Sequence, residues 1–244
     1  MMNAIWTTAF YGLLSGTVGT TAGGLLACFL PAEGKRQGAF ILEYSAGLML
    51  VVVCLDLLPG AFTYASVWHV LWGLLLGVLI MILSESLLKS HKSLSAGVPS
   101  RQTGLAIALG VALHNFPEGL AVGAGLEADP ALGMALALAI MLHDIPEGAA
   151  IAIPLQNGGV SRWKALWYTI ASGLPMGLGA LVGAWAGQLS STVISLCLAV
   201  AGGAMLYVVL GNMLPETFRM RAGHMNPVGL LLGILSGTAI ILLL

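Results

Sequence analysis

Apolar residues fill most of the chain in long stretches, and short polar segments separate one stretch from the next. About 20 apolar residues are enough for a helix to cross the hydrocarbon core of a bilayer. The polar breaks predict eight such helices, near residues 5–30, 38–60, 67–88, 103–125, 131–154, 163–187, 190–217 and 226–244. We therefore expect an all-α, polytopic membrane protein with eight transmembrane helices and a single membrane domain over 1–244.

Composition and charge support this assignment. Charged residues make up 8% of the 244 residues and hydrophobic residues 58%, whereas soluble domains carry about 25% charged residues. All nine Lys and Arg residues fall in the odd-numbered connections between the predicted helices. Because basic residues are enriched in cytoplasmic loops, both termini are expected outside the cytoplasm. We expect a multi-pass protein of the cell membrane, with the lipid bilayer around it and no nucleic-acid partner.

A polar hexapeptide occurs twice near the centre of the chain. HNFPEG at 114–119 returns as HDIPEG at 143–148, each in the middle of an apolar stretch. The first His of each copy is 11 or 12 residues into its helix, roughly 17 Å deep at ~1.5 Å per residue. The two helices run in opposite directions, so both copies should meet at the membrane midplane. The candidate ligands they contribute are His114, Asn115, Glu118, His143, Asp144 and Glu147.

These residue types favour a cation site. Ionisable side chains at membrane depth are costly unless something compensates them. Two imidazoles and two glutamates form a nitrogen and oxygen ligand set suited to zinc or another first-row divalent metal. Pro117 and Pro146 lack the N–H that would bond the carbonyls of Leu113 and Leu142, so kinks should open a polar cavity there. A membrane protein with a cation site at its midplane is most simply a transporter or channel.

A second, weaker repeat links the second and seventh predicted helices. AGLMLVVVCLDLLPGAF (46–62) is similar to GGAMLYVVLGNMLPETF (202–218), which pairs Asp56 with Asn212 and Pro59 with Pro215. With the hexapeptide pair, this suggests inverted pseudo-symmetry around Pro-kinked helices four and five, as in many secondary transporters. Chance similarity between apolar, Gly-rich helices is the alternative for this second match.

The paired hexapeptides and the eight predicted helices resemble the Zrt/Irt-like (ZIP) family of divalent metal transporters, of bacterial type, over the whole chain. The resemblance implies import of Zn²⁺, or of Cd²⁺, Fe²⁺ or Mn²⁺, and a homodimer as a common assembly. It also implies a binuclear centre, with one metal among the two histidines and two glutamates. Asn115 and Asp144 would surround the second metal with bridging glutamates, and Met49 matches a methionine that can approach the first.

Two departures from the family pattern remove negative charge. SGLPMGLGA at 172–180 places Met176 where many relatives have a glutamate that completes the second metal site. Gly211 and Asn212 stand where relatives often have paired acids. We therefore expect the second metal position to bind weakly. Asp56, near the outer end of the second helix, is either a cation attractor at the entrance or a helix-end polar residue.

Two other classes remain open: an intramembrane metalloenzyme and a purely structural metal site. Zinc proteases of the HExxH type place a general-base Glu directly after the first His, and here Asn115 or Asp144 occupies that position. The Glu is four residues after the His, which is a ligand spacing. We therefore expect a transporter and not an enzyme, and metal flux across a sealed bilayer would separate the three classes.

Overall fold

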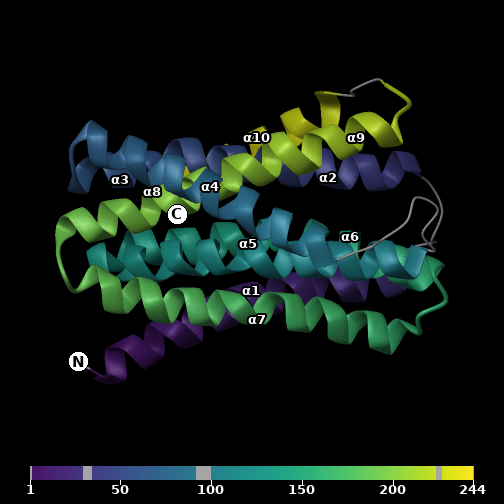
Figure 1. Ribbon diagram of the computed structural model, residues 1–244, viewed down its shortest axis with the longest axis horizontal. Helices are drawn as coiled ribbons and strands as arrows, with labels where there is room; N and C mark the ends of the chain where they lie inside the picture. The colour runs from purple at the N-terminus through teal and green to yellow at the C-terminus, as the bar shows by residue number, and fades with distance from the viewer. Residues whose placement is uncertain (1, 30–34, 92–99, 224–226, 244) are drawn as a thin grey trace.

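The computed structural model describes residues 2–29, 35–91, 100–223 and 227–243, and every regular element in these ranges is helical (Figure 1). The chain opens with α1 (Met2–Phe29) and a continuous run of α2 (Lys35–Val51), η1 (Val52–Leu57) and α3 (Leu58–Tyr64). Next come α4 (Val67–His91), α5 (Ser100–Ala128), α6 (Pro130–Asn157) and α7 (Arg162–Gly187). A second continuous run of α8 (Ser191–Tyr207), η2 (Val208–Met213) and α9 (Leu214–Met220) precedes α10 (Pro227–Leu243).

Six helical segments among the described residues are long and apolar enough to cross a membrane. They are Ile5–Phe29, Arg36–Tyr64, Val67–Leu87, Pro130–Asn157, Arg162–Gly187 and Ser191–Met220. Large apolar side chains such as Trp72 and Leu83 of α4 are exposed on the outside, as lipid would require. The predicted all-helical, polytopic membrane protein is confirmed. The count of eight spans stays a prediction, because α5 and the shorter α10 are not among the six.

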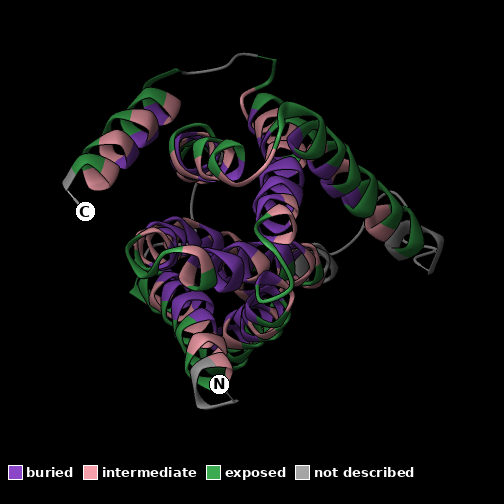
Figure 2. Cartoon of the chain, turned by 90° about the vertical axis from the view of Figure 1, so that its left-hand side faces the viewer, coloured by how far each residue is buried: buried purple, intermediate pink, exposed green. Residues whose placement is uncertain are grey.

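The helices form two groups (Figure 2). The first bundle consists of α1, α5, α6 and α7, and the second bundle of α2, α3, α4, α8, α9 and α10 with the two η segments. The bundles meet mainly through α5 against α8 and α2 against α6. The main apolar core lies at this junction and includes Met49 of α2, Ile140 of α6 and Leu198 of α8, all fully buried.

Glycines hold the helices of each bundle close together. A Cβ on Gly119 of α5 would collide with the carbonyl of Met176 on α7, and one on Gly148 of α6 with the carbonyl of Thr20 on α1. Such small residues let backbones approach closely inside a membrane. At several described glycines an added Cβ would lie under 3.0 Å from the backbone of another helix. In each case that helix belongs to the same bundle as the glycine. The closest backbone packing is thus within the bundles and not between them.

The segments η1 and η2 are short π-helical turns at equivalent positions of the weaker sequence repeat. η1 (Val52–Leu57) and η2 (Val208–Met213) each directly precede a Leu-Pro pair in the aligned stretches 46–62 and 202–218. Because π-helical turns are rare, their shared position favours a true repeat over chance similarity. The pseudo-two-fold axis and the kinks at Pro117 and Pro146 stay predictions, and α5 and α6 continue through both prolines.

Candidate metal centre

The structure buries all six predicted ligands between α5 and α6. His114, Asn115 and Glu118 come from α5, and the other three residues come from α6. Their exposed fractions range from 0% to 4%. The two helices are consecutive, joined at Asp129, whose carboxylate accepts from the backbone N–H of Ala131 and caps α6. This short connection places the two hexapeptides opposite each other.

Each histidine pairs with the glutamate of the other hexapeptide. His114 Nε2 lies 2.7 Å from Glu147 Oε2, and His143 Nε2 lies 3.0 Å from Glu118 Oε1. The two helices are thus joined at one level by two crossed His–Glu contacts. Two nitrogen and two carboxylate ligands from facing helices are a set that zinc accepts.

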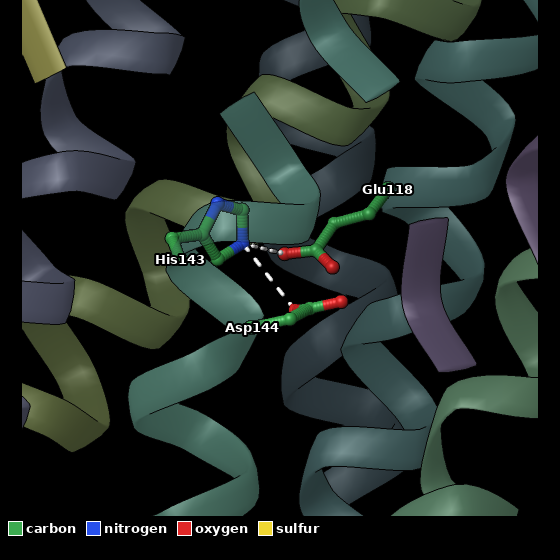
Figure 3. A group of neighbouring side chains, drawn as sticks. All are labelled: Glu118, His143 and Asp144. Atoms are coloured by element: carbon green, nitrogen blue, oxygen red, sulfur yellow. Dashed lines mark hydrogen bonds and ion pairs between the residues drawn. The ribbon is translucent and has the colours of Figure 1, made fainter. Parts of the chain in front are cut away.

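Asp144 extends this cluster on the side of His143. Its Oδ1 lies 3.7 Å from His143 Nε2, and Figure 3 shows Glu118, His143 and Asp144 pointing toward one another. One ligand atom from each of these three residues lies within 4.8 Å of the others. Three donors at this separation need only small side-chain movements to reach one cation with bonds of about 2.0–2.2 Å.

Several polar atoms of the cluster have no hydrogen-bond partner. In the described part of the chain, eight buried side-chain nitrogen or oxygen atoms lack a partner, and six of them belong to this centre. They are Asn115 Oδ1, Glu118 Oε2, His143 Nδ1, Asp144 Oδ1 and Oδ2, and Glu147 Oε1. Because buried polar groups are normally hydrogen-bonded, five unpartnered oxygens in one place make this cluster a candidate cation site.

Neighbouring helices orient the centre. Asn115 Nδ2 donates to the carbonyl of Ser172 on α7 at 2.8 Å, which leaves the Asn115 carbonyl oxygen as the free end of the amide. His114 Nδ1 lies 3.1 Å from the carbonyl of Gly110, one turn earlier in α5. From the second bundle, Ser45 Oγ donates to the carbonyl of His143 at 3.3 Å. The centre thus lies in the first bundle, and Ser45 of the second bundle contacts its backbone.

The other residues singled out in the sequence are less directly placed. Met176 is fully buried in α7, with its carbonyl against Gly119, the residue that follows Glu118. Met49 is fully buried in α2, and its approach to a metal stays a prediction. Asp56 lies in η1 with one buried, unpartnered carboxylate oxygen.

Two buried or partly buried glutamates were missed in the sequence analysis. Glu43 of α2 is fully buried and accepts from Arg221 Nε at 2.8 Å and from Arg221 Nη2 at 3.0 Å. Glu85 of α4 accepts hydrogen bonds from Tyr207 and Asn212. An ionisable residue inside an apolar stretch was the available signal for both. Glu85 places a carboxylate beside Asn212, where the sequence alone indicated a loss of negative charge.

Comparison with known proteins assigns the chain to a family. The family described as ZIP Zinc transporter matches residues 84–244. The zinc transporter ZupT of Corynebacterium aurimucosum is 34% identical over 242 residues, which covers 91% of each chain. ZupT of Chlorobium limicola is 36% identical over 244 residues, again 91% of each chain. The zinc transporter GufA of Myxococcus xanthus is 39% identical over 152 residues, 60% of each chain. The family match and the buried His–Glu cluster agree, and the chain belongs to the ZIP family of zinc transporters.

Proposed function

We propose that this protein moves Zn²⁺ across the cell membrane toward the cytoplasm through the centre between α5 and α6. The observation that carries the proposal is the group of unpartnered, fully buried oxygens around two crossed His–Glu contacts. The relatives named above are zinc transporters, and the described helices are those of a multi-pass membrane protein. Cd²⁺, Fe²⁺ and Mn²⁺ accept similar ligands and are alternative substrates.

We assign the ligands to two neighbouring positions. The first position takes the two histidines with Glu118 and Glu147, and the second takes Asn115 and Asp144 with the glutamates as bridges. The three carboxylates supply a charge of −3 when ionised, so one divalent cation leaves −1 and two leave +1. Because an uncompensated buried charge is unfavourable, and Met176 stands where a fourth carboxylate would complete the neutral pair, the second position should bind more weakly.

Transport requires that the site open to one side of the membrane at a time. Both ligand helices belong to the first bundle, whose helices are joined by close backbone contacts at glycines. No described glycine brings the backbones of the two bundles into comparably close contact; at Gly60, for example, an added Cβ would lie 3.5 Å from the Leu132 side chain of the other bundle. The first bundle can therefore move as a unit against the second and carry its cation with it. Eight spans with both termini outside complete the proposed topology.

The test is zinc flux into sealed liposomes. Variants with alanine in place of His114, Glu118, His143 or Glu147 should lose most saturable uptake and remain folded. His69→Ala and Glu127→Ala are matched controls, because both side chains belong to exposed residues outside the cluster. A metalloenzyme or a structural metal site would give no flux in the unmodified protein. Near-normal uptake in any two of the four ligand variants would contradict the assignment.

A further inference from the structure

Three buried serines each donate a hydrogen bond to the backbone carbonyl of another helix. Ser15 of α1 donates to Ala137 of α6 at 2.6 Å, and Ser195 of α8 donates to Ala61 of α3 at 2.8 Å. Ser45 of α2 donates to His143 of α6 at 3.3 Å. The three serines are 0% to 4% exposed. They are alike in chemistry and burial, so their differences in position can be compared directly.

Only the Ser45 bond of these three joins the two bundles. Ser15 and its acceptor lie within the first bundle, and Ser195 and its acceptor lie within the second. Ser45 reaches from the second bundle to the first, and its acceptor is the carbonyl of a residue in the metal centre. This bond must therefore change whenever α6 moves relative to α2.

The bond between the bundles is also longer than the two bonds within them. Hydroxyl hydrogen bonds to oxygen are usually 2.5–3.0 Å long, and the two bonds within bundles fall in that range. The Ser45 bond at 3.3 Å is longer and hence weaker. A weak bond can stabilise one arrangement of two moving parts without preventing its release.

We propose that Ser45 is a positioning residue that holds the metal-binding helix α6 in the arrangement described above and releases it during each transport cycle. This inference rests on the proposed transport function and on relative movement of the two bundles. Ser45 itself does not need to touch the cation. Its effect comes through the backbone of His143, whose side chain lies 3.0 Å from Glu118.

Removing the Ser45 bond should lower the population of the described arrangement. It should raise the population of the arrangement in which the site opens to the other face of the membrane. The apparent affinity for a substrate is the intrinsic affinity reduced by the fraction of protein in the competent state. The half-saturating zinc concentration should therefore rise on the face to which this arrangement opens and fall on the other face. A hydrogen bond of ordinary strength corresponds to a change of about two- to tenfold, so the longer Ser45 bond should give a change at the lower end of that range.

The experiment measures zinc uptake and zinc efflux in vesicles in which the orientation of the protein has been determined. Ser45→Ala should shift the two half-saturating concentrations in opposite directions. Ser45→Cys keeps nearly the same volume with a weak donor, so the same shift in this variant excludes a cavity effect. Ser15→Ala and Ser195→Ala should lower thermal stability and leave the ratio of the two concentrations unchanged.

Two results would overturn the inference. One is a Ser45→Ala protein whose half-saturating concentrations change together or not at all. The other is an equal shift of the ratio in Ser15→Ala or Ser195→Ala, because those bonds lie within single bundles. If the unmodified protein moves no zinc, the proposed function itself fails. Normal zinc flux with an unchanged ratio in the Ser45 variants removes only the role of Ser45.

Discussion

Replacing Arg221 with methionine should destabilise the protein strongly, because Arg221 neutralises a fully buried carboxylate. The side chain of Glu43 is 0% exposed and that of Arg221 is 13% exposed, with Nε and Oε1 2.8 Å apart. Breaking such a pair by removing one partner costs about 3–5 kcal/mol, since the remaining charge stays buried without compensation. We expect Arg221→Met to lower the free energy of unfolding by roughly that amount.

Arg219→Met is the matched control. Arg219 lies two residues earlier, in the last turn of α9, and its replacement removes the same charge from the same end of that helix. Its partner Glu216 is 3.4 Å away, and the two side chains are 78% and 46% exposed. Exposed ion pairs of this kind contribute about 0–1 kcal/mol. The two variants therefore separate the burial of the pair from the loss of a basic residue.

The assay measures unfolding of the purified protein in detergent through the loss of its helical circular-dichroism signal. The double variant Glu43→Gln/Arg221→Met should recover much of the lost stability, because it removes both charges together. Equal losses in Arg221→Met and Arg219→Met would refute the reasoning. A double variant no more stable than Arg221→Met alone would show that the uncompensated charge is not the cause.

Three further predictions concern topology, stoichiometry and packing. A cysteine replacing Ser95, which lies outside the described residues, should react only from the cytoplasm; labelling from outside intact cells would contradict the proposed topology. Metal titration should find one tightly bound Zn²⁺ per chain and a number closer to two in Met176→Glu, whereas two equally tight ions in the unmodified protein would contradict the charge argument. Gly119→Ala should lower thermal stability, because its Cβ collides with the Met176 carbonyl, and Gly110→Ala should not, because nothing lies within 4 Å of its Cβ. Equal stability of the two glycine variants would show that the close contact is unimportant.

The meeting of the two hexapeptides between α5 and α6 could be predicted from the sequence, but the pairing of their side chains could not. Helical spacing places Glu118 on the same side of α5 as His114, and the opposite directions of α5 and α6 place both hexapeptides at one level. Whether His114 contacts Glu118 or Glu147 depends on the rotation and offset of the two helices. Those quantities are set by packing against α1 and α7, which a motif does not encode.

Contacts between distant segments were also beyond the sequence analysis. Glu85 lies in an apolar stretch, and nothing in its neighbours indicates that Asn212 will donate to it. The bond from Ser45 to the carbonyl of His143 is harder still to foresee, because a backbone acceptor leaves no sequence signal. Periodicity and charge predict elements and their orientation, whereas the contacts between elements require the three-dimensional arrangement.

The pair of Glu43 and Arg221 has a consequence for the order of events during synthesis. The two residues are 178 positions apart, and a ribosome adds about 5–20 residues per second. Glu43 therefore enters the membrane region roughly 10–35 s before its partner exists. During that interval the carboxylate must stay near water, pair with another cation or take up a proton, because an unpaired charge is costly in an apolar medium. The ion pair can form only after Arg221, the residue that follows α9, has been made, so a segment near the end of the chain completes the surroundings of Glu43 in α2.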